Sequence, residues 1–204
     1  MNYGDLKTHF NEVLNRSDIS TVLTERFIDQ GLARIQRSLR VPFMEKQRNY
    51  TISSSTPHIT LPNDFLETRD LYHSSGTTLE RVSMETMQAL KANSLVGNPT
   101  KYAREQASLL LYPQPSDGTV TLNYYGELEA FVSDSTETTI TKVAPDLVIY
   151  AGLTFAADFY LDERSPLFEA KFKAFLEELQ EQSNDQELNG GTQSISLAFT
   201  YDEE

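Results

Sequence analysis

The chain has 204 residues and no cysteine, and its 17 Lys and Arg against 30 Asp and Glu give a formal net charge of -13. This length is enough to bury a substantial core, in one domain or in two small ones. The lack of cysteine excludes disulfides and thiolate metal sites. The negative charge disfavours tight nucleic-acid binding, because that affinity comes mainly from neutralising phosphates.

The charge is unevenly distributed along the chain. Residues 1–50 carry 8 Lys and Arg against 6 Asp and Glu, residues 51–144 carry 6 against 11, and residues 145–204 carry 3 against 13. The basic N-terminal part is therefore expected to face an acidic surface, such as one on a second copy of the chain. We expect no signal peptide. We also expect no membrane segment, because the longest apolar-rich run, 147–161, is too short to span a bilayer.

Two N-terminal helices are predicted from the spacing of apolar residues. Leu6, Phe10 and Leu14 recur at helical spacing and predict a helix over residues 3–15. A second helix is predicted over residues 19–40, before Pro42. One face of the second helix is apolar: Ile28, Leu32, Ile35 and Leu39. Its opposite face is basic: Arg26, Arg34, Arg37 and Arg40.

Residues 50–142 follow the pattern of short strands. Strands are predicted over residues 58–61, 67–73, 77–82, 109–112 and 119–125, with 67–73 and 77–82 forming a hairpin. A short helix capped by Ser83 should interrupt them. Residues 119–125 alternate apolar and polar side chains, which is typical of a half-buried strand.

Two further helices are predicted near the C-terminus. Pro145 suits the first turn of a helix that is apolar on nearly all sides to residue 161, so this helix should be central. Ser165 and Pro166 then begin a last helix. Its inward face holds Phe168, Phe172, Phe175 and Leu179. The two helices should form an αα-hairpin.

The chain after Gln182 is polar and acidic and contains Gly190 and Gly191, which is typical of a linker. It ends in a run over residues 194–201 with Ile195, Leu197, Phe199 and Tyr201 on one face of an extended strand. This C-terminal run is either an edge strand of the chain's own sheet or an arm that binds a partner by strand addition. The linker before it favours the arm.

These patterns predict an α+β fold. The N-terminal helices and the C-terminal αα-hairpin form a helical bundle, with an inserted small antiparallel β domain and an extended C-terminal tail. The expected parts are an N-terminal helical part at 1–49, a β-rich part at 50–142, a helical hairpin at 143–183 and a flexible C-terminal arm at 184–204.

The sequence offers little that suggests catalysis. His9, His58 and His73 have no metal-ligand spacing and lie in no nucleophile motif. Adjacent carboxylates such as Glu177 and Glu178 point apart on a helix. No glycine-rich loop lies between a strand and a helix. We therefore predict no enzyme activity, no cofactor and no metal, although an enzyme whose site is assembled from distant residues stays an alternative.

Three arginines form the strongest candidate interaction surface, here called the arginine face: Arg34, Arg37 and Arg40. None has Asp or Glu four residues away on the helix. They either form an ordinary solvated helix face or bind an acidic partner, because a guanidinium suits carboxylate recognition.

Several short motifs follow one another along the chain. They include Leu61-Pro62-Asn63-Asp64-Phe65-Leu66-Glu67 and Leu111-Tyr112-Pro113-Gln114-Pro115. The others are segments 15–18, 34–40, 97–102, 124–125, 144–147 and 150–153. Together they cover residues 3 to about 180, without the tail. This ordered set resembles the head-to-tail adaptor proteins of short-tailed phages.

The resemblance implies a non-enzymatic virion protein that forms a homo-oligomeric ring, commonly of twelve copies, beneath the portal. Such a ring joins the capsid to the tail, contacts the portal and tail or nozzle proteins, and leaves a channel through which DNA passes without specific binding. The arginine face would then contact a neighbouring subunit or the portal, and the C-terminal run would bind a partner. Assembly would take place in the cytoplasm of the bacterial host. Another tail-completion or nozzle-side protein is the alternative.

Overall fold

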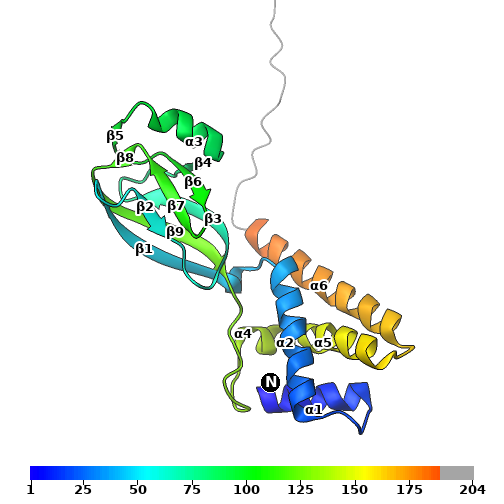
Figure 1. Cartoon of the computed structure of the whole chain (residues 1–204). Coiled ribbons are helices and arrows are strands. Elements are labelled where there is room, and N and C mark those ends of the chain that lie inside the picture. Colours follow the sequence, from blue (N-terminus) through cyan, green and yellow to red (C-terminus); the bar gives the residue numbers. More distant parts are fainter. Residues whose placement is uncertain (189–204) are drawn as a thin grey trace, which may run out of the picture. The chain divides into compact units, whose positions relative to one another are not determined.

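The computed structural model describes residues 1–188, with side chains described to Asn184. The fold is α+β, as predicted. The chain divides into two compact units. The helical unit comprises Met1–Leu39 and the chain from Ala130 onward, and the β unit comprises Arg40–Glu129. Figure 1 shows the elements of each unit in sequence colours.

The unit boundaries differ from the expected ones at 49/50 and 142/143. Strand β1 (Glu45–Ser53) begins before residue 50, and its exposed polar residues gave no apolar alternation to reveal it. Residues 130–138 belong to the helical unit because this loop is tied to the first helix. Tyr3 N–H donates to the Thr136 carbonyl at 2.9 Å, and the rings of Tyr3 and Phe131 stack with centroids 4.2 Å apart.

The helices of the helical unit are α1 (Tyr3–Leu14), α2 (Thr21–Ser38), α4 (Thr139–Val143), α5 (Pro145–Tyr160) and α6 (Ser165–Leu188). Capping residues set several of their ends. Asn2 accepts from the Asp5 N–H, Ser20 accepts from the Leu23 N–H, and Asn15 ends α1 in the left-handed conformation. No helix in the described part of the chain is long and apolar enough to cross a membrane.

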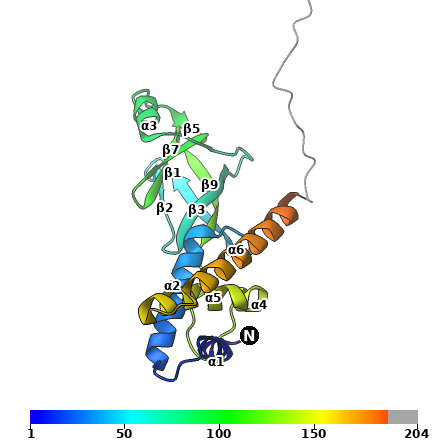
Figure 2. The same cartoon turned by 90° about the vertical axis from the view of Figure 1, so that its right-hand side faces the viewer.

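Helix α5 lies in the middle of the helical unit, and Figure 2 shows α6 alongside it. Its buried residues lie on several sides, from Leu147 and Val148 to Ala156 and Ala157, as its apolar sequence predicted. The predicted inward face of α2 is also buried, with Ile28, Ile35 and Leu39 fully enclosed. On α6, Phe168 and Phe172 are buried, whereas Phe175 is only partly buried.

Two glycines allow α2 and α5 to cross closely. A Cβ added at Gly31 would lie 2.6 Å from the backbone nitrogen of Gly152, and one added at Gly152 would lie 2.9 Å from a ring carbon of Phe10. Since real Cβ atoms almost never approach a backbone atom within 3.0 Å, the crossing requires glycine at position 31. At position 152 the nearest atom of α2 is the Phe27 carbonyl oxygen, 3.1 Å from the added Cβ, and the 2.9 Å contact is with α1.

The β unit contains three sheets. The first has the order β1-β9-β3, with β3 spanning Phe65–His73 and β9 spanning Asp117–Gly126. The second has the order β2-β7-β6-β4, and its strands are β2 (His58–Thr60), β4 (Glu80–Arg81), β6 (Lys101–Glu105) and β7 (Ser108–Tyr112). The third is the short pair β5 (Val96–Gly97) and β8 (Gln114–Pro115). A 3-10 turn, Pro42–Met44, precedes β1.

The core of the β unit comes from alternating side chains on the first two sheets. Val120, Leu122 and Tyr124 of β9 are buried, as the alternation over 119–125 predicted. Strand β7 is buried on both faces. Leu109 and Leu111 join the main core, and Leu110 and Tyr112 join a second cluster with Met87 of α3 (Met84–Lys91).

The predicted hairpin of residues 67–73 with 77–82 is wrong beyond its turn. The chain does reverse at Gly76, whose φ is 86°, and Thr77 accepts from the His73 N–H at 2.9 Å. It then pairs with β3 only at an isolated bridge, and β4 runs parallel to β6 in the second sheet. Leu79, which precedes β4, is buried in the main core of the β unit. The β unit is therefore mixed and not wholly antiparallel.

Candidate interaction surface

Arg34 does not lie on a free basic face. Its guanidinium donates to both carboxylate oxygens of Glu169 on α6, at 2.7 and 2.8 Å, and to the Thr154 hydroxyl on α5 at 3.0 Å. It also lies 4.2 Å from the ring centroid of Phe172. The expectation that Arg34 lacks a partner is therefore wrong. Its partners lie far away in the sequence, so a search for acidic residues four positions away on the same helix could not reveal them.

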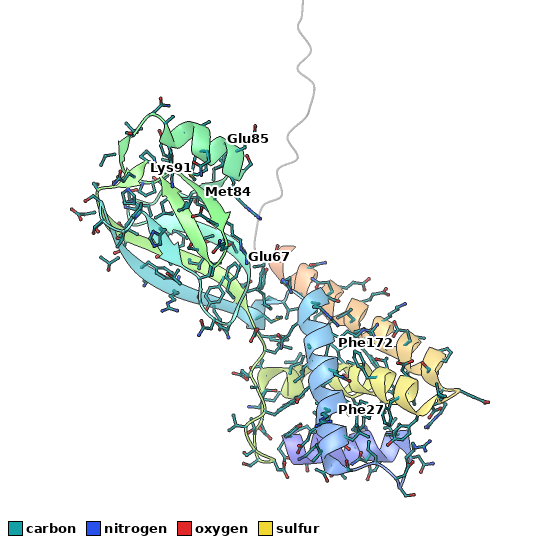
Figure 3. All side chains as sticks on the ribbon, viewed as in Figure 1. Phe27, Glu67, Met84, Glu85, Lys91 and Phe172 are labelled. Atoms are coloured by element: carbon teal, nitrogen blue, oxygen red, sulfur yellow. The ribbon has the colours of Figure 1, made fainter. Side chains whose placement is uncertain are left out.

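The pair between Arg34 and Glu169 is bidentate and partly buried. Hydrogen bonding from Arg34 holds the pKa of Glu169 below its usual value, and Lys173 adds to the effect from 3.4 Å away. Phe172, also on α6, lies among the helices in Figure 3. The cation therefore joins α2 to α5 and α6.

Arg40 also has a partner. Helix α2 ends at Ser38, and Leu39 adopts an extended backbone, so Arg40 lies beyond the helix and outside its face. Its Nε donates to the carboxylate of Glu67 on β3 at 2.9 Å. Both residues belong to the β unit, where Figure 3 labels Glu67.

Arg37 is the member of the arginine face that stays available. It is exposed, and it makes no ion pair within the described residues. Arg26 is likewise exposed and lies three turns earlier on the same side of α2, with Gln30 and Ala33 between them. The basic surface of α2 is therefore Arg26 and Arg37, without Arg34 and Arg40.

Two further cations, which the sequence did not single out, form ion pairs and hydrogen bonds inside the helical unit. Lys7 donates to Glu25 at 2.9 Å and to Asp134 at 2.6 Å, and the hydrogen bonds that it donates, first to Asp134 and then to Glu25, raise its pKa. Arg164 donates to the Leu14 carbonyl at 2.7 Å and to Asp162. The side-chain hydrogen bond from Arg164 lowers the pKa of Asp162 to about 2.

The β unit contains a regular strand edge, on β1, that has no strand partner in the described chain apart from a bridge between Ser53 at its end and Thr56. Strand β1 pairs with β9 over nine consecutive residue pairs without a register shift. On the opposite edge of this sheet, β3 has two register shifts, between Phe65 and Glu67 and between Thr68 and Asp70. The edge strands of the second sheet, β2 and β4, have three and two residues. We call the unpaired side of β1 the free edge.

The register shows which backbone groups point along the free edge. Ser54 N–H donates to the Ser116 carbonyl, so this residue pair exchanges ladder hydrogen bonds. Because bonded and non-bonded pairs alternate in an antiparallel ladder, even-numbered residues of β1 bond to β9. The N–H and C=O groups of Gln47 and Asn49 therefore point outward from the sheet.

A family model described as the SU10 adaptor protein matches residues 1–194. The chain belongs to the SU10 adaptor protein family. A search among curated proteins gave no match.

The family match confirms the resemblance to phage head-to-tail adaptors. The SU10 adaptor is a structural phage protein, so this chain is a bacteriophage virion component that interacts with other head or tail proteins. The matched range ends at residue 194, directly before Ile195.

The C-terminal run of this SU10 adaptor, with Ile195, Leu197, Phe199 and Tyr201, lies outside the described residues. The part before it differs from expectation. Residues 183–188 continue α6 to Leu188, and Ser183 is buried. The prediction of a linker directly after Gln182 is therefore wrong for residues 183–188. A helix that is already packed through Phe168 and Phe172 can extend into a polar segment at little cost in free energy.

The histidines of this adaptor have ordinary surroundings. His9 lies 3.6 Å from Glu12 on the surface of α1, and His58 is exposed. His73 is buried, and its Nδ1 accepts from the Ser75 backbone N–H at 3.2 Å. No group of three metal-ligating side chains is found in the part of the chain that the structure describes.

Proposed function

We propose that this SU10 adaptor forms a homo-oligomeric ring beneath the portal of a phage particle, where it joins the head to the tail. The ring leaves a channel for DNA and contacts the portal on one side and tail or nozzle proteins on the other. The observation that carries this proposal is the family match over residues 1–194. Assembly takes place in the cytoplasm of the bacterial host, before the particle is complete.

The charge of the chain supports passage of DNA without specific binding. A formal net charge of -13 disfavours phosphate contacts, since like charges repel. Some of the described cations also have internal uses, because Lys7, Arg34 and Arg164 are bound to carboxylates. No enzyme activity is part of this proposal.

Two surfaces are proposed to contact partners in the ring. Arg26 and Arg37 supply the remaining basic face of α2, which suits an acidic surface on the portal or on a neighbouring subunit. Ile195, Leu197, Phe199 and Tyr201 supply an arm that gains order on binding. In a ring, one surface of each subunit contacts a different surface of the next subunit. The basic face and the arm are two such surfaces.

The test uses particles made by a phage from which the gene for this protein is deleted. We expect DNA-filled heads with portals but without tails, and we expect the purified full-length chain to restore tail joining. Cryo-electron microscopy of the restored particle should then place a ring of this chain between portal and tail. Normal tailed particles without the chain, or density for it elsewhere in the virion, would contradict the proposal.

A further inference from the structure

The free edge of β1 is the feature of the β unit that most clearly lacks a partner. The side chains of Gln47, Arg48 and Asn49 are all exposed. The backbone groups of Gln47 and Asn49 point outward along the edge, as the register requires. Natural proteins normally protect such edges with bulges, prolines, very short strands or charged side chains. Strand β1 has no bulge and no proline and is nine residues long, and its protection is limited to the cations Lys46 and Arg48. A long regular edge is a template for strand addition.

We propose that the C-terminal run of a second copy, residues 194–201, pairs as a strand with the free edge of β1. This inference rests on the proposed ring, because an arm on one subunit and an edge on the next make a heterologous contact that closes around an axis. The inference identifies the binding partner of the C-terminal run as β1 of a neighbouring subunit, whereas the proposed function does not say which neighbouring protein the run binds.

The lengths of the two segments match. Strand β1 has nine residues, and the run over 194–201 has eight. Helix α6 ends at Leu188, and the five residues 189–193 precede the run. An extended chain of five residues reaches about 17 Å. The inference therefore requires the end of α6 to lie within about this distance of the free edge of a neighbouring subunit.

The side chains of the two segments also match. On β1, Tyr50 is half-buried at the margin of the β-unit core and Ile52 is buried in it, so even-numbered side chains face the core side of the sheet. An added strand would place Ile195, Leu197, Phe199 and Tyr201 on that same side, where they cover Tyr50. The other side of the sheet is polar, with Gln47 bonded to Asn123 and Asn49 bonded to Thr121.

The charges favour this occupant over an arbitrary strand. Arg48 lies 5.4 Å from the ring centroid of Tyr50 and makes no ion pair with the described residues. The C-terminal run is followed by Asp202, Glu203 and Glu204. A cation on an edge strand discourages most strand additions but attracts an acidic one.

The test measures binding of a fluorescent peptide with the sequence of residues 189–204 to the dilute full-length chain. The decisive variant is Asn49→Pro, which removes one outward N–H and leaves the ladder to β9 intact, because proline is tolerated on an edge strand. The matched control is Asn49→Ala, which loses the same hydrogen bond from Thr121 but keeps the N–H. Gln47→Pro serves as a second blocking variant, and circular dichroism checks that each variant folds.

We expect the peptide to bind the unaltered chain and Asn49→Ala within about threefold of each other. We expect Asn49→Pro to weaken binding by about tenfold or more, since hydrogen bonds and close contact are lost. Arg48→Gln should reduce both the affinity and its dependence on salt. A peptide with the same composition in scrambled order should not bind.

Equal binding to the unaltered chain and to both proline variants would overturn the inference, and so would no binding to the unaltered chain. Unfolding of both proline variants would show that the edge is not free and would overturn it as well. None of these results would remove the adaptor role, because tail joining by the full-length chain is measured separately.

Discussion

The helical unit and the β unit leave different groups available to a partner. The chain segments of the helical unit, 1–39 and 130–204, hold 9 Lys and Arg against 20 Asp and Glu, whereas the β unit holds 8 against 10. In the more acidic helical unit, Arg34, Arg164 and Lys7 each bridge segments distant in sequence, while Arg26 and Arg37 stay exposed. In the more balanced β unit, Arg40 and Lys46 are also paired with carboxylates, but Arg48 makes no ion pair with the described residues and lies on the free edge of β1. Net charge therefore does not indicate which cations are available to a partner.

In the helical unit, the described cations and side chains mainly hold the helices together. In the β unit, backbone hydrogen-bonding groups along one strand remain unused within the described chain. In the helical unit, substitutions at the crossing of α2, α5 and α6 should reduce stability. In the β unit, substitutions on the free edge should change association and leave the free energy of unfolding nearly unchanged. The four predictions below test this separation.

The largest effect is expected from Phe172→Ala in the helical unit. Phe172 is 2% exposed and lies under the guanidinium of Arg34. Its truncation should lower the free energy of unfolding by about 3–5 kcal/mol. Leu161→Ala is the control, because Leu161 is 88% exposed at the end of α5 and should change stability by less than about 0.5 kcal/mol. Chemical denaturation measures both, and equal loss in the two variants would sink the packing account.

A smaller loss is expected from Gly31→Ala. The added methyl group would press on the backbone of Gly152, and overpacking of this kind costs about 1–3 kcal/mol. The better helix propensity of alanine offsets part of this cost, so we expect a net loss of about 1–2 kcal/mol. Gly97→Ala in the β unit is the matched control, since nothing lies within 4 Å of its added Cβ. Thermal unfolding should separate them, and a stabilised Gly31→Ala variant would show that the helices do not cross closely.

The arginines provide a test within one helix. Arg34→Gln should lower the free energy of unfolding by about 1–2 kcal/mol, because a bidentate pair, a hydrogen bond and a ring contact are lost. Arg37→Gln should change it by less than about 0.5 kcal/mol. Binding to the portal should show the reverse order, with the larger loss for Arg37→Gln. If the two variants lose stability equally, the assignment of Arg34 to an internal role is incorrect.

The smallest effect is expected in the dependence of stability on pH under acidic conditions. The pKa of Asp162 is lowered to about 2 from an ordinary 3.8, and the pKa of Glu169 is also lowered. A lowered folded-state pKa contributes stability that is present above the unfolded value and is lost as pH falls through the folded value. Stability should therefore fall as pH decreases from about 4 to 2, and Arg34→Gln should reduce that fall. An unchanged pH dependence in this variant would contradict the pairing with Glu169.

The sequence predicted the fold best where local patterns coincide with burial. The helical period of Ile28, Ile35 and Leu39 and the alternation over β9 are both confirmed. Strand β1 was missed because its exposed edge carries polar residues, and the end of the α6 helix was misplaced because composition does not register packing from the preceding turns. Gly31 and Gly152 could have indicated the close contact between α2 and α5, since a glycine inside an apolar helix often marks a close helix crossing.

The candidate site was harder to predict than the fold. The arginine face was chosen from helical spacing alone, which reveals partners on the same helix but not on α6 or β3. The free edge depends on strand order and register, which no sequence pattern supplies. The adaptor family could be inferred directly, because its motifs are spread in order over residues 3 to about 180.

Residue-resolved amide hydrogen exchange of the dilute full-length chain tests the central claim most directly. We expect the amides of Arg48 and Tyr50 to exchange slowly, since they bond to β9, and those of Gln47 and Asn49 to exchange fast. Addition of the peptide with residues 189–204 should slow Gln47 and Asn49 and leave the helical unit unchanged. If Gln47 and Asn49 are already slow in the dilute chain, the edge is occupied within one subunit, and the division between an internally paired unit and an open one is wrong.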